Sequence, residues 1–372
     1  MYKTVLVNQV TGPMFVDIVN AKNRDAPVVL LTGAVEKAGT DIDSTVDVVF
    51  LPGYRKANMR TRVISWLMFT AQVSFYLWKN RKYIGEILLV TNPPLMPFLS
   101  SFHFLERVKK SILVYDIYPD ILVQENYLAQ KNPLTKLWFW LNERGFRKAD
   151  LIFTISNRMS ENLIHNYQLS NVQVIPPWVD SKFMKPIPKS QNVFFKNQLS
   201  HIDKKIVLYS GNMGDTHDFS TLIEAFNDAR VSSNYHLLFV GGGLQRKRIE
   251  ELSSTNSSIT FLDYQPAEML PYTFSSADIF YVSLGVGVGD FSIPSKTFYA
   301  MASGLPILAV CDDSSDLKRI VDENRLGRSV VPGDIQGVKD FLIMVNNKEL
   351  EEMSVNSLHL SKSYTPDNAE LF

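Results

Sequence analysis

The chain has 372 residues, a formal net charge of zero at pH 7 and 45% hydrophobic residues. This length is typical of two domains, and the apolar content supports packed cores, which excludes an intrinsically disordered chain. Zero net charge also excludes a protein that coats nucleic acid or another acidic polymer, although a local basic patch remains compatible with it.

Cys311 is the only cysteine, which rules out an intrachain disulfide and a cysteine-based zinc site and fits a reducing compartment. The first ten residues, MYKTVLVNQV, lack the apolar core of a signal peptide and predict a strand instead. The longest apolar segment, residues 65–78, is shorter than the ~20 residues that span a bilayer. We therefore expect a cytoplasmic protein without a membrane-spanning helix.

Short apolar runs alternate with helix-like stretches along the whole chain, a pattern typical of parallel βαβ units with strands buried on both faces. A first group of strands is predicted at residues 3–8, 26–33, 46–52, 86–94, 111–120, 150–156 and 172–177. A second group is predicted at 206–214, 235–243, 259–266, 278–285, 305–312 and 327–334. The polar, proline- and lysine-containing stretch between them predicts a linker.

The sequence thus predicts an α/β protein with two doubly wound, Rossmann-like domains. The expected division is an N-terminal domain at 1–180, a linker at 181–204, a C-terminal domain at 205–355 and a terminal segment at 356–372 that returns to the N-terminal domain. Ligands of such sheets bind beyond the carboxyl ends of the strands, where the motifs below all fall.

The stretch YSGNMGDTHDFSTLIEAF is a strand, a glycine loop and an amphipathic helix. Gly211 and Gly214 permit a tight turn, and amides at a helix start favour an anion. Glycines also close many ordinary strand-to-helix turns, so both interpretations stay open. The next glycine loop, at 241–243, is followed by Arg246, which fits either a phosphate contact or a solvated helix face. Lys247 and Arg248 are interpreted as solvated.

Residues 289–310, GDFSIPSKTFYAMASGLPILAV, place a lysine at the start of an otherwise apolar helix. The pattern predicts a helix from about residue 293, with Ser292 as its cap, Pro294 in the first turn and a stop at Gly304. Amides near Ser295 and Lys296, beside the lysine ammonium, would form a cationic cup suited to a diphosphate. The alternative is a lysine that only snorkels from a helix end.

These motifs resemble those of family-4 glycosyltransferases, in the order and spacing of that family. The resemblance rests on YSGNMG, FVGGG, FLDYQPAEMLP, SADIFYVSL, IPSK and MASGLPILA, with TNPPL, YDIYPD and VIPPWVD in the N-terminal half. It covers residues 80 to 340 approximately and is closest to the bacterial polysaccharide branch related to fucosaminyl transferases. The first 80 residues match poorly.

The resemblance implies the GT-B fold, in which two Rossmann-like domains flank a cleft, and retaining transfer without a metal or other cofactor. A cationic cup would replace the metal held elsewhere by an Asp-x-Asp motif, and the one such motif here, Asp41 to Asp43, is interpreted as an ordinary loop. The resemblance assigns the donor diphosphate to Gly211, Asn212, Met213, Gly214, Ser295, Lys296 and Arg246. It assigns the nucleobase and ribose to Tyr264 and Gln265.

Three departures from the family pattern involve five positions. Phe291 and Tyr299 stand where many members carry two glutamates, so Asp290, as a catalytic carboxylate, and Asp316, near the ribose, are the candidates to replace them. Asn212 and His217 stand in place of an Arg and a Lys. Tyr115 stands in place of an active-site His.

Asp116 ends the predicted strand SILVYD, residues 111–116, and is the main candidate to handle the acceptor hydroxyl, with Tyr115 and Gly12 on the acceptor side. In retaining transfer the leaving phosphate oxygen can take the proton, so Asp116 would position the acceptor more than act as a base. A helix-capping role for Asp116 is equally compatible with the sequence, and Asp120 and Gln124 are weaker candidates.

Cations flank two aromatic stretches of the N-terminal half, a pattern typical of helices that lie on an anionic membrane surface. The alternative is that both stretches cover the sheet as core helices. The cations are Arg55, Lys56, Arg60, Arg62, Lys79, Arg81 and Lys82 around residues 63–78, with a second cluster in KLWFWLNERGFRK.

The expected function is transfer of a sugar, of the hexosyl or N-acetylhexosaminyl type, from a nucleotide diphosphate to a glycan or polyprenyl-diphosphate-linked acceptor. The resemblance favours UDP over GDP and a role in capsule or O-antigen synthesis, with peripheral contact to the inner face of the membrane and no nucleic-acid partner. The alternatives are a non-catalytic partner that has lost the family carboxylates and, less well supported, a two-domain epimerase.

Overall fold

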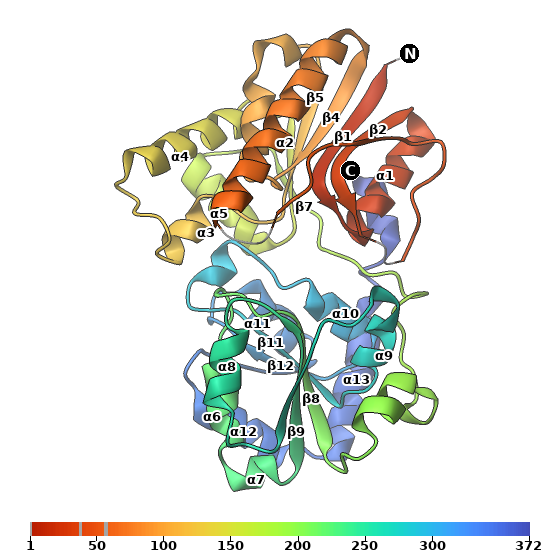
Figure 1. The fold of residues 1–372 in the computed structure, drawn as a ribbon, viewed down its shortest axis with the longest axis vertical. Helices are drawn as coiled ribbons and strands as arrows, with labels where there is room; N and C mark the ends of the chain where they lie inside the picture. Colours follow the sequence, from red (N-terminus) through yellow and green to blue (C-terminus); the bar gives the residue numbers. More distant parts are fainter. Residues whose placement is uncertain (1, 37–38, 56–58) are drawn as a thin grey trace. The chain divides into compact units, whose positions relative to one another are not determined.

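The computed structural model describes residues 2–36, 39–55 and 59–372. Contacts divide the chain into two compact units, Met1–Pro176 with Pro366–Phe372, and Pro177–Thr365. Each unit is built on one parallel sheet with helices in the connections (Figure 1). Parallel strands need crossover connections, and helices supply most of them here, which confirms the predicted α/β class.

The first unit contains a seven-stranded sheet in the order β3-β2-β1-β4-β5-β6-β7. Its central strands are buried along nearly their whole length, as expected for strands covered on both faces. Each predicted run in this half forms one strand. The strands are β1 (Lys3–Thr11), β2 (Val28–Val35), β3 (Asp47–Phe50), β4 (Ile84–Val90), β5 (Lys109–Val114), β6 (Leu151–Thr154) and β7 (Val172–Val174).

Helices fill the connections of this sheet, and in Figure 1 helix α2 crosses in front of the strands. Asn132 caps α4 by accepting a hydrogen bond from the Leu134 amide at 2.9 Å, and Pro133 takes the first helical position, where no amide partner is needed. The longer helices are α1 (Pro13–Asp25), α2 (Met59–Asn80), α4 (Pro133–Phe146) and α5 (Asn157–Tyr167), with the short α3 (Asp120–Gln124) and the 3-10 turn η8 (Pro366–Leu371).

The second unit contains a six-stranded sheet in the order β10-β9-β8-β11-β12-β13. In both sheets the first three strands are added towards one edge and the later strands towards the other edge, which is the Rossmann arrangement. Ligands bind such sheets at the carboxyl ends of the strands, near the point where the direction changes. Here the reversal lies between β8 and β11. The strands are β8 (Lys205–Asn212), β9 (Tyr235–Gly242), β10 (Ile259–Leu262), β11 (Ile279–Ser283), β12 (Ile307–Val310) and β13 (Gly327–Val330).

The helices of the second unit are shorter than those of the first. They are α6 (Ser220–Phe226), α7 (Ala229–Ser232), α8 (Arg246–Leu252), α9 (Leu270–Phe274), α10 (Lys296–Ala302), α11 (Asp316–Glu323), α12 (Ile335–Met344) and α13 (Asn347–Ser361). The 3-10 turn η7 (Val288–Asp290) precedes α10.

The start of α10 differs from the prediction. The helix begins at Lys296 rather than near residue 293, so Ser292 is not its cap. Ser295 precedes the helix and its side chain makes no capping bond, so the lysine itself opens the first turn. The predicted stop is confirmed, because Gly304 has a φ of +68°, a conformation that glycine adopts without strain.

Residues 181–204 pack on the second unit. The Lys189 ammonium contacts both carboxylate oxygens of Asp278, at 2.8 and 2.7 Å, and Asn192 Nδ2 donates to Tyr272 O at 2.7 Å. At the other end, α13 belongs to the second unit, while residues 366–372 lie in the first, where Arg24 pairs with Glu370 at 2.8 Å.

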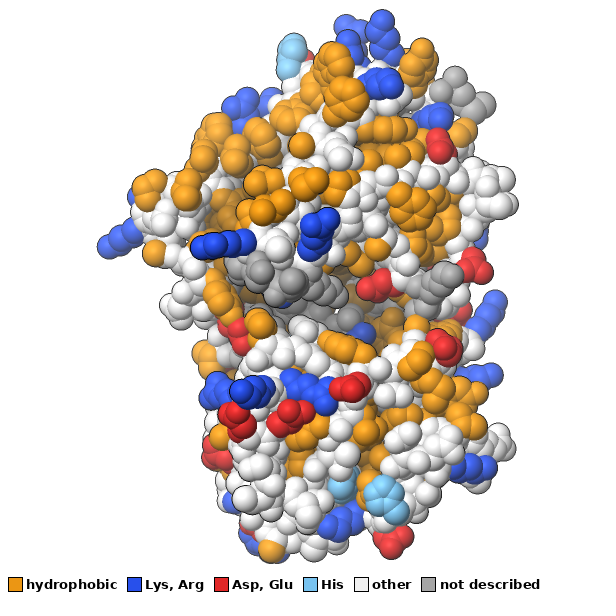
Figure 2. All heavy atoms as spheres, in the orientation of Figure 1, with side chains coloured by type: hydrophobic (Ala, Val, Ile, Leu, Met, Phe, Trp, Pro, Cys, Tyr) orange, Lys and Arg blue, Asp and Glu red, His pale blue; other side chains and the backbone are white. Residues whose placement is uncertain are grey.

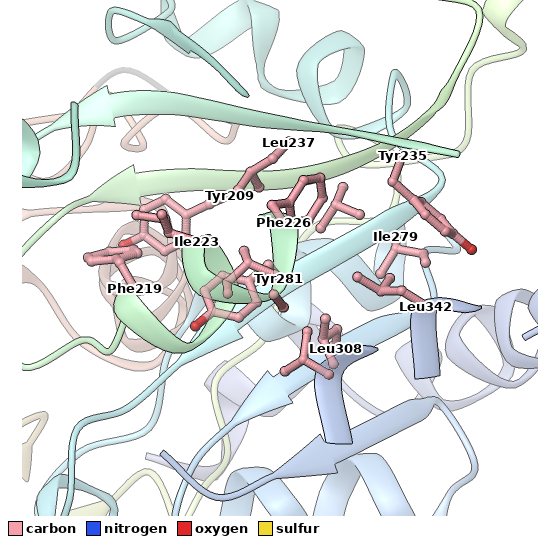
Figure 3. Packing of buried hydrophobic residues seen from close by; sticks show 14 of the residues in the cluster. Tyr209, Phe219, Ile223, Phe226, Tyr235, Leu237, Ile279, Tyr281, Leu308 and Leu342 are labelled. Carbon is pink, nitrogen blue, oxygen red and sulfur yellow. The ribbon is translucent and has the colours of Figure 1, made fainter. Parts of the chain in front are cut away.

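The core beneath the second sheet is rich in aromatic side chains (Figure 3). Tyr209 packs edge-to-face on Phe219, with ring centroids 4.8 Å apart, and its hydroxyl donates to Asn212 O at 2.7 Å. Burying a Phe or Leu side chain fully contributes ~1.5–3 kcal/mol to the stability of the fold. This core therefore supports the carboxyl end of β8.

Candidate functional site

The carboxyl ends of β8 and β9 meet backbone to backbone at two glycines. Gly211 and Gly241 are paired residues of the parallel ladder, with φ values of +153° and +131°. A Cβ on Gly241 would lie 2.0 Å from Gly211 O, closer than any real contact. Both the conformation and the spacing therefore require glycine at position 241.

Lys296, the first residue of α10, lies beside Gly211, the β8 member of this pair. A Cβ on Gly211 would be 3.7 Å from Lys296 Cε. The Lys296 ammonium is also 4.8 Å from the centre of the Tyr299 ring, a cation–π contact one helical turn along. The structure thus brings together the loop at Gly211 and the lysine that the sequence placed at the same sheet edge.

The loop after β8 is less open than the sequence suggested. Met213 is buried in the core, and its amide donates to Gly242 O at 2.7 Å. The Gly214 amide donates to Asn212 O at 3.0 Å. The amides of Met213 and Gly214, which were assigned to a diphosphate, are therefore engaged within the protein, whereas Asn212 is exposed at the end of the strand.

Gln245 holds this loop in place, a role the sequence did not indicate. Its Nε2 donates to Gly214 O at 2.7 Å and to His217 O at 2.9 Å, and its backbone amide donates to Met213 O at 3.0 Å. Two glycine loops from neighbouring strands are thereby joined by a single side chain.

His217 stands in the same loop and is neutral. Its Nδ1 lies 2.6 Å from Ser283 O, which accepts a hydrogen bond from it, and burial lowers the pKa of the imidazole although that hydrogen bond raises it. His217 therefore adds no positive charge to the Lys296 region, in contrast to the cation expected there from the family pattern.

Arg246 opens α8 and is tied to two carboxylates. Its Nε donates to Glu250 at 2.7 Å, and its NH1 donates to Asp263 and to Gly241 O, both at 2.6 Å. These partners neutralise much of the guanidinium charge. Arg246 thus lies beside the glycines at the end of β9, where its hydrogen bond to Gly241 O stabilises that strand end.

Tyr264 lies flat over the second glycine loop. Its ring carbons are 3.3 and 3.2 Å from the Cβ positions of Gly241 and Gly242, and its hydroxyl donates to Gly242 O at 3.0 Å. The side chain is still 60% exposed, so one ring face is open to stacking. The neighbouring Gln265 side chain donates back to Asp263 O at 3.0 Å.

The two carboxylates expected to replace the family glutamates differ in setting. Asp316 is only 6% exposed and forms an ion pair with Arg319 at its own helix start, so it does not present a carboxylate to a ribose. Asp290 ends η7 and is partly exposed, in a loop fixed by Gly287, whose amide donates to Asp312 at 2.5 Å.

In the first unit, Asp116 and Tyr115 follow β5 at the carboxyl edge of the sheet. The Tyr115 amide donates to Thr91 Oγ1 at 3.1 Å, which joins the ends of β4 and β5. Burial raises the pKa of Tyr118, and the Asp116 carboxylate raises it further, so the two side chains lie within electrostatic reach.

Asp120 has the stronger perturbation on this loop. Burial raises the pKa of its carboxyl to about 6, although the hydrogen bond donated by Tyr167 at 2.6 Å lowers it. A perturbed carboxylate beyond a strand end is typical of a functional site, so Asp120 deserves equal weight with Asp116 as an acceptor-side candidate.

Gly12 caps α1, and its carbonyl accepts bonds from the Phe15 and Val16 amides at 3.0 and 3.1 Å. A Cβ on Gly12 would be 3.5 Å from a carboxylate oxygen of Glu36. An acidic neighbour at the start of α1 fits a hydroxyl-bearing ligand better than an anion.

No group of three or more His, Cys, Asp or Glu residues that could hold a metal ion occurs within residues 2–36, 39–55 and 59–372. In that same part of the chain, every helix is too short or too polar to cross a membrane.

The candidate site residues of the second unit, between Gly211 and Asp316, lie in a part of the chain that matches a known family. Residues 204–345 match the family described as Glycosyl transferases group 1. WbjE of Pseudomonas aeruginosa, named a probable glycosyltransferase, is 24% identical over 262 residues, which are 68% of this chain and 64% of WbjE. WcaI of Escherichia coli K12, named for glycosyl transfer in colanic acid biosynthesis, is 29% identical over 236 residues, which are 61% of this chain and 56% of WcaI. The chain thus matches less than two thirds of the length of either relative.

Solved structures resemble the chain over its full length. Sucrose-phosphate synthase from Thermosynechococcus elongatus has a TM-score of 0.74 at 16% identity, covering 100% of this chain and 97% of that one. HepE from Anabaena, solved with UDP-glucose, has a TM-score of 0.72 at 13% identity, covering 100% and 98%. At these identities the likeness shows the fold. The chain has the GT-B fold, as expected, and its second unit is similar to group 1 glycosyltransferases.

Proposed function

We propose that this chain is a retaining, metal-independent glycosyltransferase that moves a sugar from a nucleotide diphosphate to a glycan or a polyprenyl-diphosphate-linked acceptor. The names of WbjE and WcaI, which match in part, support a role in bacterial surface polysaccharide synthesis. The proposal includes the hexosyl or N-acetylhexosaminyl class of sugar and the branch related to fucosaminyl transferases.

The observation that carries the proposal is the contact of Lys296 with Gly211 at the reversal point of the second sheet. An ammonium beside a glycine at the carboxyl end of a strand can bind a pyrophosphate, because a charge-assisted hydrogen bond to a phosphate oxygen is strong and the glycine adds no side chain at that point. The Tyr299 ring faces the same ammonium at 4.8 Å and holds it at the sheet edge.

In the proposed reaction the bond from the sugar to the diphosphate breaks, and negative charge develops on the leaving phosphate oxygen. The Lys296 ammonium and the exposed Ser295 hydroxyl, with the amide of Gly211, would stabilise that charge without needing to rearrange. Asn212 would contact the outer phosphate oxygens. Arg246 would act indirectly, through its hydrogen bond to Gly241 O, and Met213 would contribute only as a buried core residue.

Tyr264 supports a nucleobase position on the same unit. Its exposed ring face, over Gly241 and Gly242, offers a stacking surface, and the Gln265 backbone follows directly. We favour UDP as the nucleotide, since the structurally similar HepE was solved with UDP-glucose.

On the first unit, Asp116 would position the acceptor hydroxyl, with Tyr115 and Gly12 beside the same strand ends. In retaining transfer the hydroxyl proton passes to the leaving phosphate oxygen, so a carboxylate need only orient the acceptor. Asp290 remains the proposed carboxylate of the donor loop, since Asp316 is held by Arg319.

A second candidate function has a specific observation behind it. Phe291 and Tyr299 occupy the positions of the family glutamates, and the replacement candidate Asp316 is buried in an ion pair. A GT-B-fold binding protein without transfer activity would show these features. It would bind a nucleotide weakly and would not hydrolyse any sugar nucleotide.

The test is a panel of UDP-, GDP- and ADP-sugars with the full chain. A ligand that binds only the native state raises the melting temperature with its concentration, so the panel first identifies the donor. The selected donor is then followed by NMR for slow hydrolysis, with and without EDTA. Release of the sugar with its original anomeric configuration in EDTA supports the proposal. Binding without hydrolysis favours the binding protein, and no binding to any donor contradicts both.

A further inference from the structure

Helix α2 carries apolar side chains on both of its long faces. Phe69, Val73 and Leu77 point into the unit and are fully buried. The opposite stripe is exposed, with Phe75 at 61% and Trp78 at 51%. The outer stripe also contains Val63, Ile64, Leu67 and Met68, each at least 40% exposed.

This outer stripe is unusual for a helix that covers a sheet, because the solvent side of such a helix is normally polar or charged. Residues 63–78 contain no charged side chain at all. At ~1.5 Å per residue the stripe from Ile64 to Trp78 is about 20 Å long. A continuous exposed apolar surface of this length indicates a binding surface.

Helix α4 contributes a second exposed apolar row. Leu134, Leu137 and Trp140 recur at intervals of three residues, on one side of the helix, and are 74%, 49% and 50% exposed. The opposite side is fixed in the unit by Asn142, which donates to Tyr118 O at 2.8 Å, and by buried Phe146.

Each of the two helices stacks a tryptophan on a tyrosine from a neighbouring segment. Trp66 of α2 stacks on Tyr54, and Trp138 of α4 stacks on Tyr118, with ring centroids 6.2 and 6.4 Å apart. Arg62 and Tyr54 both act electrostatically on the Tyr118 hydroxyl. In Figure 2 the hydrophobic side chains gather over the α2 and α4 regions on one face, with Lys and Arg among them.

Basic side chains border this apolar surface. The Arg81 guanidinium lies 5.3 Å from the centre of the Trp78 ring, and Arg144 lies 5.5 Å from the Trp140 ring. Residues 59–80 contain no Asp or Glu. Arg60, Lys79, Lys82 and Lys136 are exposed nearby, and the predicted contribution of Lys56 lies outside the described residues.

We propose that the outer faces of α2 and α4, here called the α2–α4 surface, lie on an anionic lipid bilayer. An apolar stripe bordered by cations matches the acyl–headgroup boundary, where the apolar side chains enter and Lys or Arg meet lipid phosphates. Trp beside Arg suits the same depth, since the ring is amphipathic and the guanidinium reaches the headgroups. Charge complementarity favours a lipid surface over a second copy of this chain, because two copies would bring like charges together.

This inference goes beyond the proposed transfer reaction, and its test measures no transfer. The full chain is sedimented with two kinds of vesicle. One is pure phosphatidylcholine, and the other contains roughly 30% phosphatidylglycerol, which gives the surface a negative charge. The expected result is binding to the anionic vesicles that is at least tenfold stronger than to the neutral ones and weakens with salt. Equal or absent binding to both would overturn the proposal.

Two variants localise the surface. The double variant Phe75→Ser with Trp78→Ser should weaken binding at least tenfold, whereas Met344→Ser with Val355→Ser, exposed apolar residues of the second unit, should leave it unchanged. Circular dichroism checks that each variant is folded. Equal binding by the two double variants would contradict the assignment to α2.

Brominated lipids provide a measurement that needs no destabilising change. Anionic vesicles with bromine near the headgroup boundary should quench the tryptophan fluorescence of the wild type, and Trp78→Phe with Trp140→Phe should remove most of the quenching. Trp178, which is buried in the second unit, should contribute none. Quenching that persists in Trp78→Phe with Trp140→Phe would overturn the proposal. Size-exclusion chromatography tests the alternative of a second copy: a wild-type dimer that the Phe75→Ser, Trp78→Ser variant dissociates would also overturn it.

Discussion

Lys296 and Gly211 are in contact across the reversal point of the second sheet: a Cβ on Gly211 would lie 3.7 Å from Lys296 Cε and 3.9 Å from Lys296 Cγ. The two residues come from different strand–helix connections, which meet because β8 and β11 are neighbours in the sheet. The fold itself thereby places the Lys296 side chain beside the end of β8, before any ligand binds.

Tyr299 should set the position of this ammonium. Tyr299→Leu removes the ring that faces Lys296 at 4.8 Å, whereas Tyr299→Phe keeps it. Since a cation–π contact contributes ~0.5–2 kcal/mol, the Leu variant should bind UDP about 2- to 30-fold more weakly, and the Phe variant should bind as the wild type does. Calorimetric titration measures both constants. Equal affinities for the Leu and Phe variants would show that the ring has no such role.

Gly241 should tolerate no side chain. In Gly241→Ala the new methyl group would meet Gly211 O at 2.0 Å, on a backbone with φ of +131°. Gly333→Ala is the matched control, because its φ is +88° and nothing lies within 4 Å of the added atom. The control should lose about 1–2 kcal/mol from backbone strain alone. Gly241→Ala should lose clearly more free energy of unfolding, measured in urea, and a loss no larger than that of the control would refute the close packing.

Asp120 should make stability depend on pH in a defined direction. The pKa of its carboxyl is about 6 in the folded chain and 3.8 when exposed, because burial disfavours the charge. Between about pH 4 and 6 the native state therefore holds a proton that the unfolded chain has released, so stability falls as the pH rises through this window and is level above it. At ~1.4 kcal/mol per unit, the cost is about 3 kcal/mol at pH 7.

The Asp120→Asn variant tests this dependence, since an amide oxygen can still accept the bond from Tyr167. The difference in unfolding free energy between variant and wild type should shift by about 3 kcal/mol in favour of the variant from pH 4 to pH 7. Asp340→Asn, at an exposed position, is the control and should show no such shift. Parallel curves for wild type and Asp120→Asn would contradict the burial of a charged carboxylate.

The strand pattern of the sequence predicted the fold well, because strands buried on both faces are continuous apolar runs and the carboxyl ends of parallel strands share one edge. That rule alone brings Gly211 and Lys296 together. The start of α10 was predicted too early, because residues 292–294 are not helical and the helix begins at Lys296. Proline and serine at 292–295 are compatible with either arrangement, so the pattern could not distinguish them.

The other contacts of the site fall into two groups, those between residues close in sequence and those between distant residues. The Asp316–Arg319 ion pair and the Lys296–Tyr299 contact join residues three positions apart on one helix, so helical spacing offered a signal that was not used. Gln245 reaches Gly214 from a different connection, and nothing local to either residue indicates that bond. Similarly, only the folded chain shows that the Met213 amide is engaged by Gly242 O.

The most direct measurement is a calorimetric titration of UDP into the wild type, Lys296→Ala and Lys247→Ala. Lys247 is an exposed lysine of α8 in the same unit, 3.9 Å from Glu251, and is the matched control. If the Lys296 ammonium binds the diphosphate, Lys296→Ala loses a charge-assisted hydrogen bond of ~1.5–3 kcal/mol and weakens UDP binding by about 10- to 150-fold, while Lys247→Ala binds as the wild type does. Unchanged UDP affinity in Lys296→Ala would contradict the pyrophosphate seat at Lys296 and Gly211.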